Sequence, residues 1–154
     1  MASLKEADFF YGAALSALFN KGFSPSIVEG GVDRQIYDVM TDEGQYRLYI
    51  KYRSFHREGK DGYKSWQFNF NNDYYPIERF IEDGYKLFVI LVCGCETLTE
   101  SELVVLSSEN IMKVFDNQKY TLTISRSKGE KAYRLPIGGG RSNSIKIPTN
   151  TLLE

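Results

Sequence analysis

The segment 54–64 has the composition that could most directly support recognition of a charged partner. It reads SFHREGKDGYK and interleaves basic with aromatic side chains. Aromatic rings stack on nucleic-acid bases and basic groups neutralise phosphates, so this composition suits a single-stranded nucleic acid. A protein interface rich in Tyr and Arg, or a solvated loop, fits the same residues. The candidate partner-binding residues, which include two basic positions further along the chain, are Arg53, His56, Arg57, Lys60, Tyr63, Lys64, Arg126 and Arg141.

Two other short motifs could bind a metal or a phosphate. Both cysteines lie in Cys93-Gly94-Cys95, and His56 is the single histidine. A structural zinc site needs four ligands and a redox pair normally uses Cys-x-x-Cys, so we expect reduced thiols and no resident cofactor. The run Gly138-Gly139-Gly140-Arg141-Ser142 could hold a phosphate through its amides. A nucleotide P-loop needs Lys-Ser/Thr and a following helix, so we interpret this run as a hairpin loop.

Composition indicates one globular domain. The chain has 154 residues, of which 42% are hydrophobic and 25% are charged, enough apolar residues to form a core. The longest apolar run, 87–95, is shorter than the roughly 20 residues that cross a bilayer, and it reads as a buried strand. The N-terminal residues include acids where a signal peptide needs an apolar stretch. We therefore expect a cytoplasmic protein without membrane contact.

The net charge of −1 results from cancellation between blocks. Residues 1–50, 51–71, 72–116 and 117–154 carry net charges of −3, +3, −6 and +5. A uniformly basic nucleic-acid binder is excluded. A positive face exists only if the two basic blocks meet in the fold, whereas neighbouring blocks could instead neutralise one another. The sequence leaves this choice open, with mutual neutralisation slightly preferred.

Hydrophobic spacing predicts a single α+β domain with an N-terminal helix packed on a mixed, mostly antiparallel sheet. A capping-box pattern from Ser3 to Glu6 begins this helix, and Gly22 ends it. The elements follow the order αβββαβ and then βαβββ. Strands are predicted at 27–28, 34–40, 45–53, 66–70, 85–93, 103–106, 120–126, 131–135 and 145–147, and further helices at 73–83 and 107–115.

The first part of this order, over residues 3–93, resembles the core of the PD-(D/E)XK restriction-endonuclease-like superfamily, with residues 94–154 as a β-rich C-terminal extension. The chain is also similar in general pattern to small bacterial and phage proteins, which suggests a phage or mobile-element context. Members of the superfamily hold a divalent metal with an Asp on one strand and an acid two residues before a Lys on the next. Clustered carboxylates suit Mg²⁺, and the Lys orients water or stabilises the phosphate.

The resemblance implies specific residue roles in this chain. Asp33 or Asp38 matches the first acid, and Tyr49-Ile50-Lys51 falls at the second motif. Tyr49 replaces the acidic ligand, which removes half of the metal-binding charge. Some members carry an extra acid on the first helix, and Glu6 or Asp8 matches it. A bland alternative is a solvent-exposed hairpin face with cross-strand ion pairs that contribute under about 1 kcal/mol each.

Two hypotheses follow from the sequence. The preferred one is a non-catalytic interaction domain, a degenerate nuclease-like scaffold without a cofactor. It binds an acidic protein surface or a nucleic acid through residues 51–64 and the basic C-terminal hairpins. The alternative is a Mg²⁺-dependent nuclease that uses Asp33, Asp38 and Lys51, with the two acids as metal ligands and Glu29 or Glu6 in place of the missing acid. Two or more carboxylates gathered around Lys51 would favour the enzyme.

Overall fold

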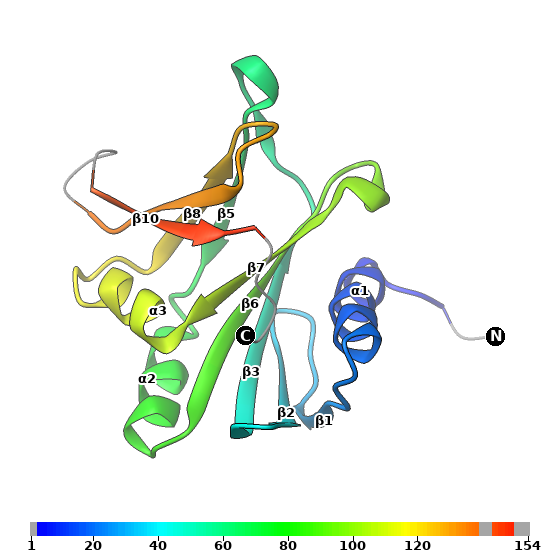
Figure 1. Ribbon diagram of the computed structural model, residues 1–154, viewed down its shortest axis with the longest axis vertical. Helices are drawn as coiled ribbons and strands as arrows, with labels where there is room; N and C mark the ends of the chain where they lie inside the picture. The colour runs from blue at the N-terminus through cyan, green and yellow to red at the C-terminus, as the bar shows by residue number, and fades with distance from the viewer. Residues whose placement is uncertain (1–2, 139–142, 150–154) are drawn as a thin grey trace.

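The protein is an α+β fold built from three helices and two five-stranded sheets, seen in a computed structural model that describes residues 3–138 and 143–149 (Figure 1). The first sheet has the strand order β1-β2-β3-β6-β7, and the second has the order β10-β9-β8-β5-β4. Strands β3 and β6 run parallel, and the other paired neighbours are antiparallel. The sequence therefore predicted the fold class, but it predicted one sheet where the structure has two.

Most element bounds agree closely with the predicted ones, but the short strand at Arg57–Glu58 was not predicted. The helices are α1 (Glu6–Asn20), α2 (Tyr74–Glu82) and α3 (Ser108–Phe115). The first sheet contains β1 (Ser26–Glu29), β2 (Gln35–Thr41), β3 (Gly44–Arg53), β6 (Lys86–Cys93) and β7 (Glu102–Ser107). The second contains β4 (Arg57–Glu58), β5 (Lys64–Asn69), β8 (Thr121–Arg126), β9 (Ala132–Pro136) and β10 (Ser144–Pro148).

The N-terminal helix differs from its predicted start. It begins at Glu6, and the backbone N–H of Lys5 donates to the carboxylate of Asp8 at 2.8 Å, so the expected Ser3–Glu6 capping box lies two residues too early. Its end is as predicted, because Gly22 adopts a φ of 88° that a residue with a side chain rarely takes. The helix packs its buried residues against the first sheet and places Glu6 at one end of that contact.

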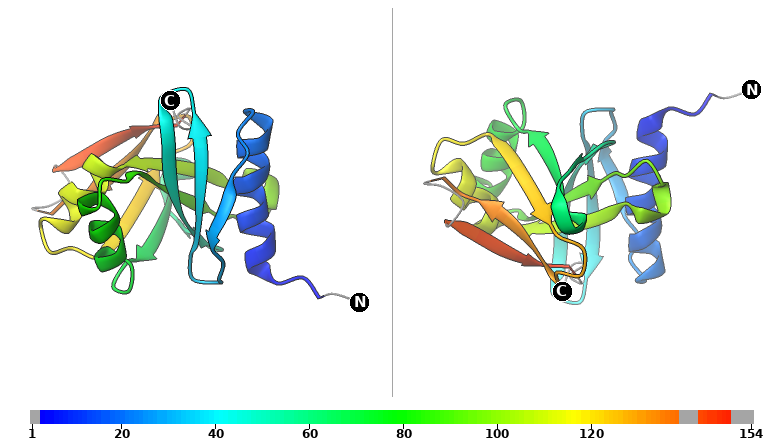
Figure 2. Two further views of the ribbon diagram at one scale, coloured as in Figure 1. Left: turned by 90° about the horizontal axis from the view of Figure 1, so that it is seen from below. Right: turned by 90° about the horizontal axis from the view of Figure 1, so that it is seen from above.

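The first sheet is covered on both faces, which gives the molecule three layers (Figure 2). One core lies between α1 and the first sheet and contains Leu48 and Ile50 of β3. The other lies between the two sheets with α2 and α3, and it contains Tyr49. The alternation of β3 therefore puts Arg47, Tyr49 and Lys51 in the inter-sheet layer, where Arg47 and Lys51 are each only 8% exposed. The alternative of a solvent-exposed hairpin face is therefore wrong for Lys51, whereas Asp33 is exposed and Asp38 is half-buried.

Both halves of the chain are needed for both sheets. Strand β7 pairs with β6 in the first sheet, whereas β8 pairs with β5 in the second. The stretch 94–154 is therefore interleaved with residues 3–93 through strand pairing. The two basic blocks also meet, because β4 and β5 come from one and β8, β9 and β10 from the other.

Candidate functional site: a polar cleft at the end of strand β3

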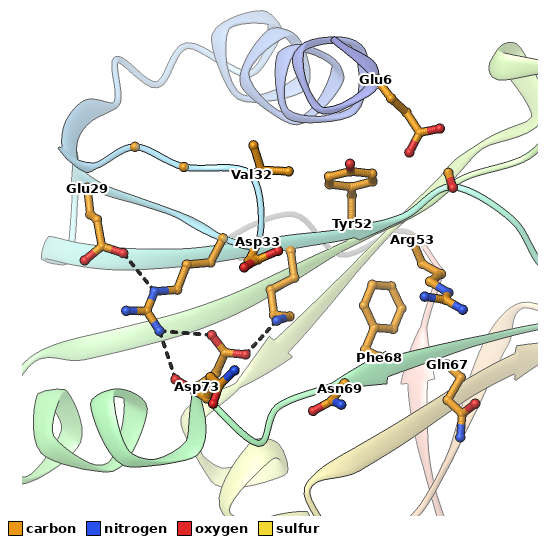
Figure 3. A pocket seen from close by; sticks show the side chains of 16 residues that line it. Glu6, Glu29, Val32, Asp33, Tyr52, Arg53, Gln67, Phe68, Asn69 and Asp73 are labelled. Carbon is orange, nitrogen blue, oxygen red and sulfur yellow. Dashed lines mark hydrogen bonds and ion pairs between the residues drawn. The ribbon is translucent and has the colours of Figure 1, made fainter.

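A cleft of about 700 Å³ opens where β3 ends (Figure 3). Its walls come from the start of α1, the β1–β2 loop, the last residues of β3, strand β5 and the two residues before α2. Four acidic residues line it, Glu6, Glu29, Asp33 and Asp73, together with three basic ones, Arg34, Lys51 and Arg53. A cleft of this size with convergent charged groups is a candidate ligand site.

The carboxylate of Asp73 is the centre of the hydrogen-bond network at the bottom of the cleft. Oδ2 accepts from Lys51 Nζ at 2.6 Å, and Oδ1 accepts from the Tyr49 hydroxyl and, at 3.2 Å, from Arg34 Nη1. Asp73 is 3% exposed, so its charge is tolerated because these donors replace water. Burial and the neighbouring Asp73 raise the pKa of Tyr49 well above its ordinary value, which keeps its hydroxyl protonated as a donor.

Asp73 reaches this position because of where the chain turns into α2. It is the N-cap residue of the helix, as the sequence predicts, but its side chain makes no capping hydrogen bond. The carboxylate turns instead toward β3. In a sequence, an acid at the start of a helix is expected to be a capping residue. Asp73 was therefore not identified as a candidate site residue from the sequence. The polar run Asn71-Asn72-Asp73 between a strand and a helix was the only available signal.

Arg34 connects the two sides of the cleft. Its Nε donates to Glu29 at 2.8 Å, while Nη1 also donates at 3.0 Å to the Tyr49 hydroxyl and to the carbonyl of Asn72. The hydrogen bond to Glu29 raises the pKa of Arg34, so the guanidinium stays charged. The β1–β2 loop is thereby tied to the residues that precede α2.

Asp33 is one of three exposed acids in the cleft, with Glu6 and Glu29. It precedes β2 and lines the same wall as Arg34, and no ion pair to it is recorded among residues 3–138 and 143–149. Figure 3 shows Asp33 on the β1–β2 loop, Asp73 across from it at the start of α2, and Glu6 on α1. Tyr52 also lines the cleft. Its burial raises the pKa of its hydroxyl, and the negative charge of Glu6 adds a smaller rise.

A hydrogen bond from α1 holds the loop that carries Asp33. The buried Tyr11 hydroxyl donates to the carbonyl of Val32 at 2.7 Å. We expect Tyr11→Phe to lower the free energy of unfolding by about 1 kcal/mol, the net contribution of one such bond. Amide hydrogen exchange in 30–34 should accelerate more than exchange in α1, because the loop loses its tether.

Tyr133→Phe is the matched control for this prediction. The hydroxyl of Tyr133, a residue as buried as Tyr11, donates at 2.7 Å to Glu102 of β7, so its loss leaves the β1–β2 loop tethered. Exchange in 30–34 should then stay at the wild-type rate. Equal acceleration in both variants would show that the Tyr11 bond does not position the loop.

The structure brings together some of the residues expected for a nuclease and separates others. Asp33 and Lys51 line the same cleft. Asp38 lies opposite Arg47 in the β2–β3 pairing and binds it through two hydrogen bonds of 2.9 and 3.0 Å. Arg47 and Lys51 are four residues apart on β3, about 13 Å at 3.3 Å per residue. Asp38 therefore belongs to a different ion pair, and Asp73 takes the place near Lys51.

The described part of the chain offers few side chains that could together bind a metal ion. It contains no cluster of three or more His, Cys, Asp or Glu side chains arranged to hold a metal ion. A cation in the cleft would therefore depend on two carboxylates completed by water and a phosphate, a set that Mg²⁺ accepts. Asp33 lines the cleft on the β1–β2 loop, and Asp73 is the cleft acid that bonds directly to Lys51.

The predicted partner-binding residues have different surroundings. Arg53 lines the cleft and stacks on the exposed ring of Phe55 at 4.3 Å. Arg57 and Lys60 are exposed in β4 and in the 3₁₀ turn that follows, and Tyr63 is half-buried. Arg141 lies outside the described residues, as does most of the glycine-rich run.

Three others are engaged inside the protein. Lys64 Nζ lies 3.7 Å from Cys95 Sγ. Arg126 pairs with Glu102 at 2.6 Å, and Tyr133 donates to the same carboxylate at 2.7 Å. His56 Nε2 lies 2.9 Å from Glu58, while its buried Nδ1 has no hydrogen-bond partner within the described residues. The segment 51–64 is therefore not one continuous basic surface.

Both cysteines are free and buried. Burial raises the pKa of each thiol, and Lys64 partly offsets this rise at Cys95. Neither thiol is activated as a nucleophile by these surroundings.

No family model, curated protein or solved structure matches this chain. Among the described residues, no helix combines the length and the apolar character needed to span a membrane. The geometry of the cleft therefore carries the functional argument.

Proposed function

We propose that the protein is a Mg²⁺-dependent nuclease whose active site is the cleft at the end of β3. The observation that carries the proposal is the position of Asp73. The sequence lacks the motif acid because Tyr49 occupies its place, and the Asp73 carboxylate lies within hydrogen-bond distance of both Tyr49 and Lys51. A carboxylate beside the lysine is thus supplied by the start of α2.

Electrostatics also support a cation-dependent function. The cleft is lined by four acidic and three basic side chains, and Lys51 and Arg34 are already paired with acids. A phosphate chain would meet a net negative surface there, so entry of phosphates into the cleft itself is unfavourable without a cation. A bound Mg²⁺ neutralises phosphoryl oxygens and lowers the pKa of a coordinated water.

The residues of the chain have distinct roles in this proposal. Asp33 and Asp73 would hold the metal, because carboxylate oxygens are its preferred protein ligands. Lys51 donates to the phosphate or to the attacking water and stabilises the charge that develops in hydrolysis. Arg34 keeps Asp73 and the β1–β2 loop in place through the bonds described above.

A second candidate is a non-catalytic domain that binds nucleic acid. One observation favours it: the Asp73 carboxylate is already bonded to Lys51, Tyr49 and Arg34, which occupies much of its capacity for a metal. In that case the network stabilises the cleft and no hydrolysis occurs.

A cleavage assay separates the two candidates. Labelled single- and double-stranded DNA and RNA are incubated with the protein in Mg²⁺, in Mn²⁺ and in EDTA. Cleavage that requires the metal supports the nuclease. Binding in a gel-shift assay without cleavage of any of the four substrates rejects the nuclease and supports the second candidate. The absence of both binding and cleavage rejects both.

A further inference from the structure

The outer face of the second sheet carries a straight row of basic and hydroxyl side chains. Strand register places Arg57 opposite Ser65, Ser65 opposite Ser125, Ser125 opposite Arg134 and Arg134 opposite Lys146. Directly opposed residues lie on the same face of a sheet, so all five project to one side. The row crosses five strands, about 19 Å at 4.8 Å per strand.

This face is turned away from the core. Trp66, Phe68, Leu122, Ile124, Tyr133, Leu135 and Ile147 fill the inter-sheet core from the second sheet. Alternation then puts the row residues on the opposite side, where Arg57, Arg134 and Lys146 are exposed. Figure 1 labels strands β5, β8 and β10 of the second sheet, and the row lies on the side of this sheet that faces away from the first sheet.

The chemistry of the face suits a polyanion better than an apolar protein surface. None of the large exposed hydrophobic side chains recorded for the described residues belongs to β5, β8, β9 or β10. A shallow hollow of about 280 Å³ is lined by Lys131, Arg134 and Lys146 together with Ala132 and one acid, Glu130. Glu130 pairs with Arg134 at 3.3 Å and offsets part of the positive charge, which leaves a net positive charge on the residues that line the hollow.

The basic face is continuous with the cleft through β5. Gln67 and Asn69 follow Ser65 on the same side of that strand, and both line the cleft. A chain that occupies the cleft can therefore extend over Gln67 onto the row without crossing the core.

We propose that the outer face of the second sheet binds the phosphate backbone of a nucleic-acid strand that extends from the cleft. This inference rests on the proposed function, because it concerns the same polymer. Arg57, Arg134 and Lys146 each neutralise one phosphate, and the half-buried Ser65 donates its hydroxyl to a phosphate oxygen, whereas Ser125 is buried and makes no such contact. The contacts are to the backbone, so they position the strand without reading its sequence.

Salt dependence of binding tests this proposal directly. We measure the affinity for a fluorescein-labelled single-stranded 20-mer DNA by anisotropy in EDTA, so that no cleavage occurs, over a series of salt concentrations. The variant is Arg57→Ser/Arg134→Ser/Lys146→Ser. We expect the slope of log affinity against log salt to become shallower by about 2, because each phosphate contact to a single strand contributes about 0.7.

The matched control removes the same charge from another surface. Lys21, Arg79 and Lys113 are exposed residues at the end of α1, on α2 and on α3. The triple serine variant at these positions should keep the wild-type slope. Thermal melting by circular dichroism confirms that both variants are folded. Equal slope changes in both variants would overturn the proposal, since the effect would then follow net charge alone, and so would an unchanged slope in the first variant.

The result can be separated from the test of the nuclease. A shallower slope without metal-dependent cleavage keeps the binding surface and rejects the hydrolytic activity. If wild-type protein cleaves but the row variant keeps the wild-type slope, the nuclease activity is supported and the binding surface is rejected. A single-stranded RNA of the same length tests whether the backbone alone is recognised. Competition by polyglutamate as effective as by unlabelled DNA would assign the face to acidic proteins and would also overturn the proposal.

Discussion

Lys51→Met is expected to lower the rate of metal-dependent cleavage by about 10²–10³-fold, the usual loss when one preorganised donor to developing charge is removed. Methionine preserves the flexible apolar stem of lysine, although it lacks the charge and the Nζ atom that lies over the Phe70 ring. Asp73 retains its bonds to Tyr49 and Arg34 in this variant. The rate is measured in single turnover with labelled DNA at saturating protein, so that weaker binding does not contribute.

Arg47→Met provides the control because the two residues are closely matched. Arg47 and Lys51 lie on the same face of β3, each is 8% exposed, and each is paired with a buried or half-buried aspartate. Arg47 contacts Phe80 and Tyr85, outside the cleft. We expect its cleavage rate to stay within about twofold of wild type. A similar loss of cleavage rate in both variants would mean that removing a buried charge from β3 impairs folding, and that Lys51 has no specific role in cleavage.

Local patterns predicted most elements of this fold correctly. Alternation defined β3, the apolar run of β6 indicated burial on both faces, and Ser107 caps α3 through its hydroxyl, which accepts from Asn110. The division into two sheets was not predicted. It depends on the pairing of β5 with β8, and nothing in either strand distinguishes that partner from the neighbouring hairpin.

The surroundings of the candidate residues depend on tertiary structure. Lys51 and Asp33, which the resemblance suggested, line the same cleft, whereas Asp38 lies elsewhere and Asp73 was expected only at the start of a helix. Cross-strand register decides that Asp38 meets Arg47, and the direction in which the chain enters α2 decides that Asp73 meets Lys51. Both are tertiary facts. The contact between the two basic segments could not be predicted either, because it depends on the strand order of the second sheet.

Asp73→Ala is expected to lower the free energy of unfolding by about 3–5 kcal/mol, the range seen when one partner of a buried ion pair is removed. The variant leaves the Lys51 ammonium and the Tyr49 hydroxyl without their acceptor in a nearly water-free position. Urea denaturation measures the loss. Asp38→Ala is the comparison, because Asp38 is half-buried and its pair with Arg47 is more accessible to water. We expect a loss of about 1–2 kcal/mol there.

The double variant Lys51→Met/Asp73→Ala decides why the pair exists. If the two groups act as a unit, Asp73→Ala should destabilise the Lys51→Met protein by at least about 2 kcal/mol less than it destabilises wild type, which is a coupling energy within the range for contacting residues. Additive losses would contradict the network described here. Buried ion pairs are often no more stabilising than apolar replacements of similar volume. A double variant nearly as stable as wild type would therefore show that folding does not require the pair. Its retention at the bottom of a polar cleft would then follow from what Lys51 and Asp73 do to a ligand.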